Sequence, residues 1–488
     1  YEALRANTTA SNNTAVGTSA LKVNTTGTKN AAVGAYALDA NTTGGDNTAI
    51  GYNALSANTT ASYNIAVGSG ALAANTTGDW NVGIGTDSFD ANTTGSNSVA
   101  VGGRSLSANT TGTSNTALGY AALRNNTTAN NNTAVGKDCM SANTTGTDNV
   151  AVGSNALDAN TTGGDNTAIG DNALGANTTA NANTAVGSAS MDANTTGAGN
   201  VGIGYAALGA NTTASSCTAV GYDALVLNTT GASNVAVGRS SLDTNTTGGY
   251  NVALGAYALD ANATASNNTA VGYDALAANV GGSNTAIGRS AGNSITSGAN
   301  NILIGYSAGS DTVLMTDGAQ NICIGNYSRT AASGSDYQIV MGYSVTGNAD
   351  DSFCFGRTTV DSAIAFGATS ITAPSDIRLK EDIQEEEVGL DFINELRPVT
   401  FQWKKEKDVP EELVAHGEGS EERVMNGKYN HGFIAQEVKE VIDRYDLKEG
   451  FDMWSEDEVD GRQRIGEGSL IPMLVKSIQE LSAEVEQL

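Results

Sequence analysis

Basic side chains are scarce in this sequence, and long apolar runs are missing. Of its 488 residues, 24 are Lys or Arg and 51 are Asp or Glu, which leaves a net charge of −27. A protein that holds a phosphate backbone needs a basic face, so we expect no nucleic-acid partner. No apolar run reaches the roughly 18 residues that a membrane helix needs, so we expect no membrane insertion.

Cysteine is also rare, and its placement argues against a metal or redox site. The four cysteines are Cys139, Cys217, Cys323 and Cys354, and none belongs to a CxxC pair. Cys139 and Cys323 occupy positions that other repeats fill with small residues, which favours inert packing. No calcium-loop motif recurs either, so we expect no metal and no cofactor.

What the sequence has in abundance is one repeated motif, NTAVG and its variants. Its Gly recurs sixteen times, always 17 residues apart, and is never replaced. Such a period is typical of solenoids, in which each unit stacks on the next. The sixteen glycines are residues 17, 34, 51, 68, 85, 102, 119, 136, 153, 170, 187, 204, 221, 238, 255 and 272.

Each 17-residue unit predicts a short strand, a second apolar motif and a turn. In the first unit, alternation places Thr14 and Val16 on one face of the strand and Ala15 on the other. The invariant Gly predicts positive φ or a lack of space for a Cβ atom. The Gly of NTTG is Ala in six units, so that turn does not require positive φ. Asn-Thr-Thr is formally a glycosylation acceptor, but a turn with stacked Asn side chains is the favoured interpretation.

These features predict a mainly β protein whose shaft, residues 1–290, is a parallel β-solenoid or β-roll. One unit cannot bury its own apolar side, whereas stacked units can. At roughly 4.8 Å per coil, sixteen coils make a rod on the order of 75 Å long. The small apolar residues predict a thin core, which suggests that several chains pack together. A helical repeat is disfavoured by the Gly, Asn and Thr content.

At this point the repeats resemble a known family. The pattern NxAVGxxAL is similar to the head repeats of trimeric autotransporter adhesins, which form parallel β-rolls that associate as trimers, and to repeats in phage tail fibres. The resemblance covers residues 1–290. It implies a homotrimer.

After Gly272 the regular spacing ends, and residues 291–374 are predicted to be an irregular β-rich neck. The strand-Gly motif persists there at intervals of 16, 17, 20, 17, 14 and 11 residues. YQIVMGYSV and FCFGRTTV are stronger strand segments than any earlier one.

Residues 375–488 differ in composition and predict a separate α+β domain. They hold 29 acidic and 14 basic residues, whereas residues 1–300 hold 16 and 8. VGLDFINELRPV predicts a short helix, VTFQWKK a strand, and HGFIAQEVKEVIDRY a strand followed by a helix. The polar segment 411–430 predicts a projecting loop or hairpin. The last apolar residues step by 4, 3, 4 and 3, which predicts a coiled-coil tail that meets its copies in a trimer. This trimerisation seam comprises Leu474, Ile478, Leu481, Val485 and Leu488.

Four segments together resemble the self-cleaving intramolecular chaperone domain of phage tailspikes and endosialidases. They are SDIRLKEDI, GLDFINELRPVTFQWK, HGFIAQEV and LIPMLVKSIQEL. The resemblance implies a domain that trimerises, templates the β-rich fibre and then cuts itself off. It also implies a Ser-Lys dyad, in which Ser375 is the nucleophile and Lys380 its base. The cleaved bond would be Pro374–Ser375 or Ser375–Asp376.

Two further functions stay open beside that of a trimeric phage tail fibre or spike. A bacterial surface adhesin or appendage could carry the same tail, which would place the chain on the cell surface rather than in a virion tail fibre. Either protein could contact a glycan or protein of a host cell surface. A glycosidase is disfavoured, because scattered residues such as Asp46 and Asp165 recur at turns and line no obvious cleft. The only enzymatic activity expected is self-cleavage.

Overall fold

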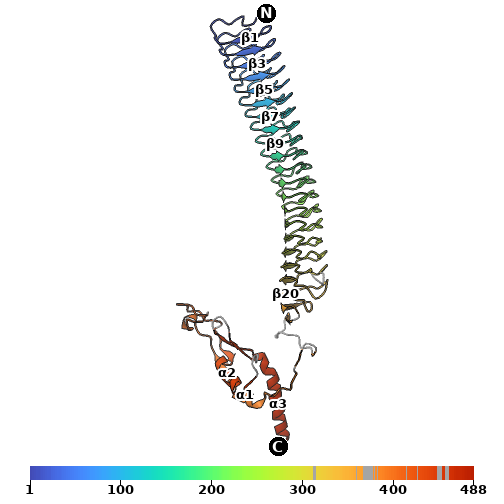
Figure 1. Cartoon of the computed structure of the whole chain (residues 1–488), viewed down its shortest axis with the longest axis vertical. Coiled ribbons are helices and arrows are strands. Elements are labelled where there is room, and N and C mark those ends of the chain that lie inside the picture. Colours follow the sequence, from blue (N-terminus) through green and yellow to red (C-terminus); the bar gives the residue numbers. More distant parts are fainter. Residues whose placement is uncertain are drawn as a thin grey trace. The chain divides into compact units, whose positions relative to one another are not determined.

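The structure, a computed structural model, describes residues 1–487 except 311–314, 359, 367–376, 378–379, 382, 414, 426, 448–452 and 457–460, and leaves out the side chains of 360, 361 and 467. The chain divides into two compact units, Tyr1–Pro374 and Ser375–Leu488. The first unit is an elongated stack of coils, and the second contains three α-helices and short strands (Figure 1).

The first unit confirms the predicted parallel β-solenoid. Each 17-residue unit forms one coil and contributes one three-residue strand, which pairs in parallel with its equivalent in the next coil. The strands are β1 (Thr14–Val16), β2 (Ala31–Val33), β3 (Thr48–Ile50), β4 (Ile65–Val67), β5 (Val82–Ile84), β6 (Val99–Val101), β7 (Thr116–Leu118), β8 (Thr133–Val135), β9 (Val150–Val152), β10 (Thr167–Ile169), β11 (Thr184–Val186), β12 (Val201–Ile203), β13 (Thr218–Val220), β14 (Val235–Val237), β15 (Val252–Leu254), β16 (Thr269–Val271), β17 (Thr285–Ile287), β18 (Ile302–Ile304) and β19 (Ile322–Ile324).

The core of the shaft is thin, as the small residues predicted. The middle residue of each strand points inward, and Ala32 and Ala49 are fully buried. A Leu, Met or Phe on the opposite side of the coil completes the apolar core, for example Leu38 and Phe89. The first and last residues of each strand point outward, so the alternation predicted for Thr14, Ala15 and Val16 holds along the stack.

Two columns of buried Asn side chains hold neighbouring coils together. In one column, the amide of Asn41 donates to Oδ1 of Asn24 at 2.8 Å and to the carbonyl of Gly44 at 3.0 Å. In the other, Oδ1 of Asn30 accepts the backbone N–H of Asn47 at 3.0 Å. Because buried polar groups must be paired, each Asn binds one coil to the next. Asn24 and Asn41 are fully buried, so the interpretation of Asn-Thr-Thr as a stacked turn fits and a glycan on these side chains does not.

The invariant Gly meets both requirements that its conservation along the chain predicted. Gly136 has φ +141°, a conformation that residues with a Cβ atom rarely adopt. A Cβ atom there would lie 2.2 Å from the carbonyl oxygen of Gly153 in the next coil. The Leu column also has positive φ, for example +51° at Leu38, which the sequence analysis did not predict. Its backbone N–H donates to Ala54 of the next coil at 3.0 Å, so bonding between coils supports the strained conformation.

The neck continues the solenoid, but its large buried side chains come from other positions of the coil than in the regular shaft. At the coil of Gly288 the Leu position becomes Gly292, and Leu303 replaces the inward Ala of the next strand. A Cβ atom at Gly292 would lie 2.6 Å from Cδ1 of Leu303, so the larger strand residue fills the space. Ile295 takes a position that earlier coils fill with Asn, and it is also fully buried.

The last strands of the neck are longer and end the parallel sheet. They are β20 (Gln338–Tyr343), β21 (Ser352–Arg357) and β22 (Val360–Ala365). β20 and β21 pair in parallel, and β22 then pairs with β21 in antiparallel fashion. The antiparallel strand covers the edge that the stack of parallel strands would otherwise leave open.

The second unit contains the helices and strands that its sequence predicted, which are α1 (Leu390–Glu395), β23 (Val399–Phe401), β24 (Asn430–Gly432), α2 (Ala435–Arg444) and α3 (Leu470–Gln487). It also contains η2 (Glu406–Asp408), β25 (Trp454–Glu456), β26 (Gln463–Ile465) and η3 (Glu467–Ser469), which the sequence did not predict. β23 pairs with β24, and β25 with β26, both antiparallel. Phe392 of α1, Val438 and Val441 of α2, and Met473 of α3 share one apolar core.

Stacking in register also places like charges together at one point of the shaft. Asp243 and Asp260 occupy equivalent positions in adjacent coils, and their carboxyl groups are hydrogen-bonded. Burial first, and then the carboxyl of Asp260, raise the pKa of Asp243 to about 7. A second carboxylate so close makes loss of the proton unfavourable.

We predict that Gly136→Ala destabilises the shaft by about 1–3 kcal/mol, because it forces a Cβ atom into positive φ and against Gly153. Gly146→Ala is the matched control in the next turn. A Cβ atom at Gly146 would also lie 2.2 Å from a carbonyl oxygen, that of Gly163, but this column does not have positive φ and holds Ala in six other coils. Gly146→Ala should therefore lose less than about 1 kcal/mol, and the comparison isolates the cost of positive φ. Urea unfolding followed by circular dichroism measures both, and equal losses would contradict the assignment.

We predict that Asp243→Asn removes part of the pH dependence of shaft stability. The folded chain raises the pKa of Asp243 above its unfolded value, so the folded state binds this proton more tightly. The stability it contributes is therefore present at low pH and is lost as the pH rises from about 4 to about 7. Melting at pH 5 and pH 8 should show a smaller difference for Asp243→Asn than for wild type. The exposed Asp171→Asn should leave that difference unchanged.

Candidate functional site

Ser375 of the predicted dyad lies outside the described residues, as do Pro374 and Asp376 beside the predicted cleavage site. Lys380 is described: its side chain is exposed, and its backbone N–H donates to the carbonyl of Ile377 at 3.3 Å. The Ser-Lys dyad therefore stays a prediction.

The domain that follows the dyad is held together by packing of α1 against α3. Phe392 is fully buried between the helices and meets the ring of Tyr445 edge-on, with 5.4 Å between centroids. Glu480 of α3 accepts the backbone N–H of Leu390 at 2.7 Å, at the first turn of α1. A carboxylate at that position pairs an N–H group that the helix itself leaves unpaired. Phe392 is the buried residue of α1 and Leu396, which caps the helix, is also buried, whereas Ile393 is half-buried.

The two histidines have structural hydrogen bonds. Nδ1 of His431 lies 3.3 Å from the hydroxyl of Thr400 across the β23–β24 pair. His416 is half-buried, and its Nδ1 lies 2.7 Å from the carbonyl oxygen of Val409. Neither contact involves Lys380.

Ion pairs connect the polar segment before α2 to the residues that precede it in the sequence. Lys405 and Lys407 both bind Glu421, and their hydrogen bonds lower the pKa of Glu421 to about 2. Lys405 and Arg423 also form an antiparallel bridge. The predicted hairpin is therefore closed by surface charge, since the side chains involved are exposed.

The described part of the predicted trimerisation seam lies on the open face of α3. Leu470, Met473 and Ser477 are buried against the rest of the unit. The seam residues Leu474, Ile478, Leu481 and Val485 are exposed, and Leu488 lies outside the described residues. The sequence analysis missed Ile471, which is 63% exposed and extends the seam by one step of three residues. Counting backward from Leu474 would have found it.

The cysteines of the shaft are buried, as inert packing predicts. Burial raises the pKa of Cys139 and Cys323 to about 12 and also raises that of Cys217. The thiolate is the reactive form, so these side chains are poor nucleophiles.

The shaft offers little catalytic chemistry among its described residues. The stacked carboxyl groups of Asp243 and Asp260 interact with each other, whereas the two carboxyl groups of a glycosidase lie about 5–9.5 Å apart on either side of the scissile bond. Within the described ranges, no three His, Cys, Asp or Glu side chains are grouped as metal ligands. A separate search of the described helices found none that is both long and apolar enough to cross a membrane.

Comparison with known protein families identifies the second unit. Residues 375–447 match the family described as the chaperone of endosialidase (Peptidase_S74). Comparison with curated proteins and with solved structures returned no match. The chain therefore carries a chaperone-of-endosialidase domain that begins at residue 375 and follows a long parallel β-solenoid, an arrangement that fits an endosialidase-type fibre.

Proposed function

We propose that this chain forms the shaft of a trimeric phage tail fibre or spike. In this proposal the C-terminal domain joins three chains, assists assembly of the β-solenoid and then releases itself by autoproteolysis next to Ser375. The observation that carries the proposal is that two boundaries fall at the same place in the sequence. The family match begins at residue 375, and the division of the chain into two compact units falls between Pro374 and Ser375.

The self-cleavage is a proposed acyl transfer by Ser375. Its Oγ would attack the carbonyl carbon of Pro374, and the amine of Lys380 would take the hydroxyl proton and pass it to the departing nitrogen. This attack closes a five-membered ring, whereas attack on the carbonyl of Ser375 itself would close a strained four-membered ring. We therefore favour Pro374–Ser375 over Ser375–Asp376. Water would then hydrolyse the ester.

The exposure of Lys380 also suggests why cleavage would follow assembly of the trimer. A lysine amine acts as a base only where burial or nearby positive charge disfavours its protonated form. The side chain of Lys380 is exposed in the single chain. Contact with other copies would have to supply the enclosed environment, which would make cleavage follow trimerisation.

The trimer is supported by an apolar face that runs along the shaft. The last residue of every strand from β1 to β19 is Val, Ile or Leu, and the first is Thr, Ala, Val or Ile. Ile50 is 43% exposed, and Leu118 is 46% exposed. No charged residue interrupts these outward positions, and soluble monomers rarely expose so long an apolar surface. We propose that the outward strand face packs against the same face of other copies.

The open face of α3 is proposed to join the same three chains. Its exposed apolar residues recur at the spacing of a coiled-coil seam. Lys476 and Glu480, which lie off that seam, pair at 3.8 Å. Short helices gain little stability alone, so the seam would act together with the strand face.

We predict that purified wild-type trimer releases a fragment that spans residues 375–488. Ser375→Ala should abolish release, and Lys380→Ala should slow it by about 10²–10⁴-fold, because the general base is lost. Ser455→Ala, an exposed serine in β25, is the control and should cleave normally. Intact mass under denaturing conditions measures cleavage, and native mass measures assembly. A wild-type trimer that stays whole would overturn autoproteolysis and leave only the assembly role.

We predict that Ile169→Cys forms disulfide-linked dimers under mild oxidation, because the strand faces of different copies meet. Thr162→Cys, exposed at the turn of the same coil, should remain unlinked. The native cysteines are buried, so their background should be low. Non-reducing electrophoresis measures the links, after light scattering has measured the mass of the assembly. A particle with the mass of one chain, or equal linking of both variants, would argue against the proposed interface.

A further inference from the structure

The column that follows the invariant Gly changes character along the shaft. In the coils from Gly68 to Gly187, the first or second residue after the Gly is aromatic only at Tyr120. In every coil from that of Gly238 to that of Gly342, one of these two residues is Tyr or Arg. We call this set the aromatic ladder, and it comprises Arg239, Tyr257, Tyr273, Arg289, Tyr306, Tyr327 and Tyr343.

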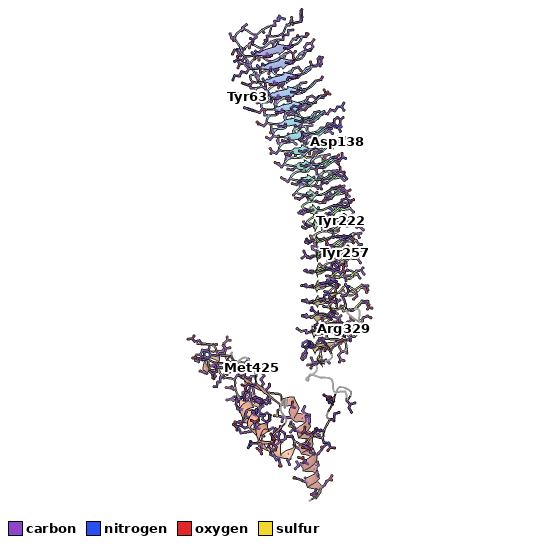
Figure 2. The ribbon with its side chains drawn as sticks, in the orientation of Figure 1. Tyr63, Asp138, Tyr222, Tyr257, Arg329 and Met425 are labelled. Atoms are coloured by element: carbon purple, nitrogen blue, oxygen red, sulfur yellow. The ribbon has the colours of Figure 1, made fainter. Side chains whose placement is uncertain are left out.

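Consecutive members of the ladder touch one another over its whole length. The ring centroids of Tyr257 and Tyr273 are 5.9 Å apart, those of Tyr306 and Tyr327 are 5.0 Å apart, and all are edge-to-face. The guanidinium carbon of Arg289 lies 5.8 Å from the ring of Tyr273 and 5.7 Å from that of Tyr306. Figure 2 labels Tyr257, which lies on the shaft below Tyr222 in that view.

Three of the five ladder tyrosines, Tyr273, Tyr306 and Tyr343, are exposed, whereas Tyr257 and Tyr327 are half-buried. Tyr273 is 47% exposed and Tyr343 is 51% exposed, although both lie against other ladder members. Asp260 and Asp274 occupy flanking positions, and the pKa of Asp274 is raised, mainly by burial. The ladder is thus a strip of aromatic rings, in which neighbouring rings stand nearly perpendicular, with carboxylates beside it.

An earlier pair shows what the same positions form in space. Tyr36 and Tyr52 have the geometry of Tyr257 and Tyr273, with centroids 6.0 Å apart and planes at 88°. Together with Asp39, Asn53 and Ser56 they line a shallow hollow. The equivalent positions beside Tyr257 and Tyr273 include Asp260 and Asp274, so the ladder repeats an aromatic surface edged by hydrogen-bonding groups.

We infer that the aromatic ladder binds a neutral, extended polysaccharide of β-1,4-linked pyranose rings. Such a chain is a flat ribbon whose C–H faces pack on aromatic rings and whose edge hydroxyls bond to carboxylates and amides. Coils are spaced at about 4.8 Å, close to the rise of one sugar in that ribbon. The inference names a glycan partner for the proposed fibre, so its biological meaning rests on the proposed function.

Charge disfavours the other polymers that bind stacked aromatic rings. Single-stranded nucleic acids also use aromatic rings and Arg, but they need a positive groove. Residues 205–343 contain seven Asp and three Arg, and no Lys, Glu or His. The net negative charge would repel phosphates and uronic acids, whereas a neutral sugar chain is not repelled.

The test is native gel electrophoresis of the full chain in gels that contain hydroxyethylcellulose, a soluble neutral β-1,4-glucan. Dextran, whose linkages are α-1,6, is the polymer control. We compare wild type with the double variant Tyr273→Ala/Tyr306→Ala. The matched control is Tyr120→Ala, since Tyr120 occupies the same column where the neighbouring coils have Gly103 and Lys137. Melting temperature and oligomeric mass are measured on the same samples.

Hydroxyethylcellulose should retard wild type and Tyr120→Ala. The affinity of the double variant for this polymer should fall by roughly tenfold or more. Dextran should retard none of them. The inference is overturned if hydroxyethylcellulose does not retard wild type. It is also overturned if the double variant melts earlier but binds normally, since the ladder would then only join coils. A trimeric, cleaved sample that fails to bind would reject this inference and leave the fibre proposal intact, whereas an uncleaved monomer that binds would do the reverse.

Discussion

Stacking of equivalent residues in register is the constraint on which the shaft depends. Each coil places its strand and its turn directly over those of the previous coil, and in most coils two Asn side chains are stacked in the same way. Residues that bond or pack well with themselves are therefore favoured at each column. Asn satisfies this because its amide is both donor and acceptor, Ala because it is small, and Tyr because rings pair edge-to-face. Asp satisfies it poorly, and Asp243 and Asp260 show the consequence as a pair whose carboxyl groups resist joint ionisation.

The same constraint explains which parts of the fold could be predicted from the sequence. The period, the inward Ala and the invariant Gly are properties of single columns, so sixteen copies within one chain act as an internal comparison. The positive φ of Leu38 could not be found in this way, because Leu has no intrinsic preference for that conformation and only the neighbouring coil supports it. The sequence also did not reveal that Leu303 fills the space left by Gly292. These two residues belong to different columns, which only the folded coil brings together.

The C-terminal unit was predictable for a different reason. Its α-helices and the strands β23 and β24 follow from local signals such as the Pro398 after α1 and the apolar spacing of α3, whereas β25 and β26 were not predicted. Contacts between distant segments had no such signal, for example that of Glu480 with the first turn of α1. The partnership of Ser375 and Lys380 is of the same kind, because it depends on a three-dimensional approach that neither residue encodes alone. It came from family resemblance and remains a prediction.

A shaft of equivalent coils has a problem that its own stability cannot solve. If three chains pack through the outward strand face, a shift of one chain by one coil replaces Val with Ile or Leu and changes little. The regular region therefore specifies the face but not the alignment, and long-range β assembly is prone to such errors. The neck differs, because its intervals of 16, 20 and 14 residues and its core of Leu303 and Ile295 have no equivalent one coil away. A chaperone domain that joins the chains next to this aperiodic neck would align them there first. The periodic coils could then extend that alignment along the whole shaft.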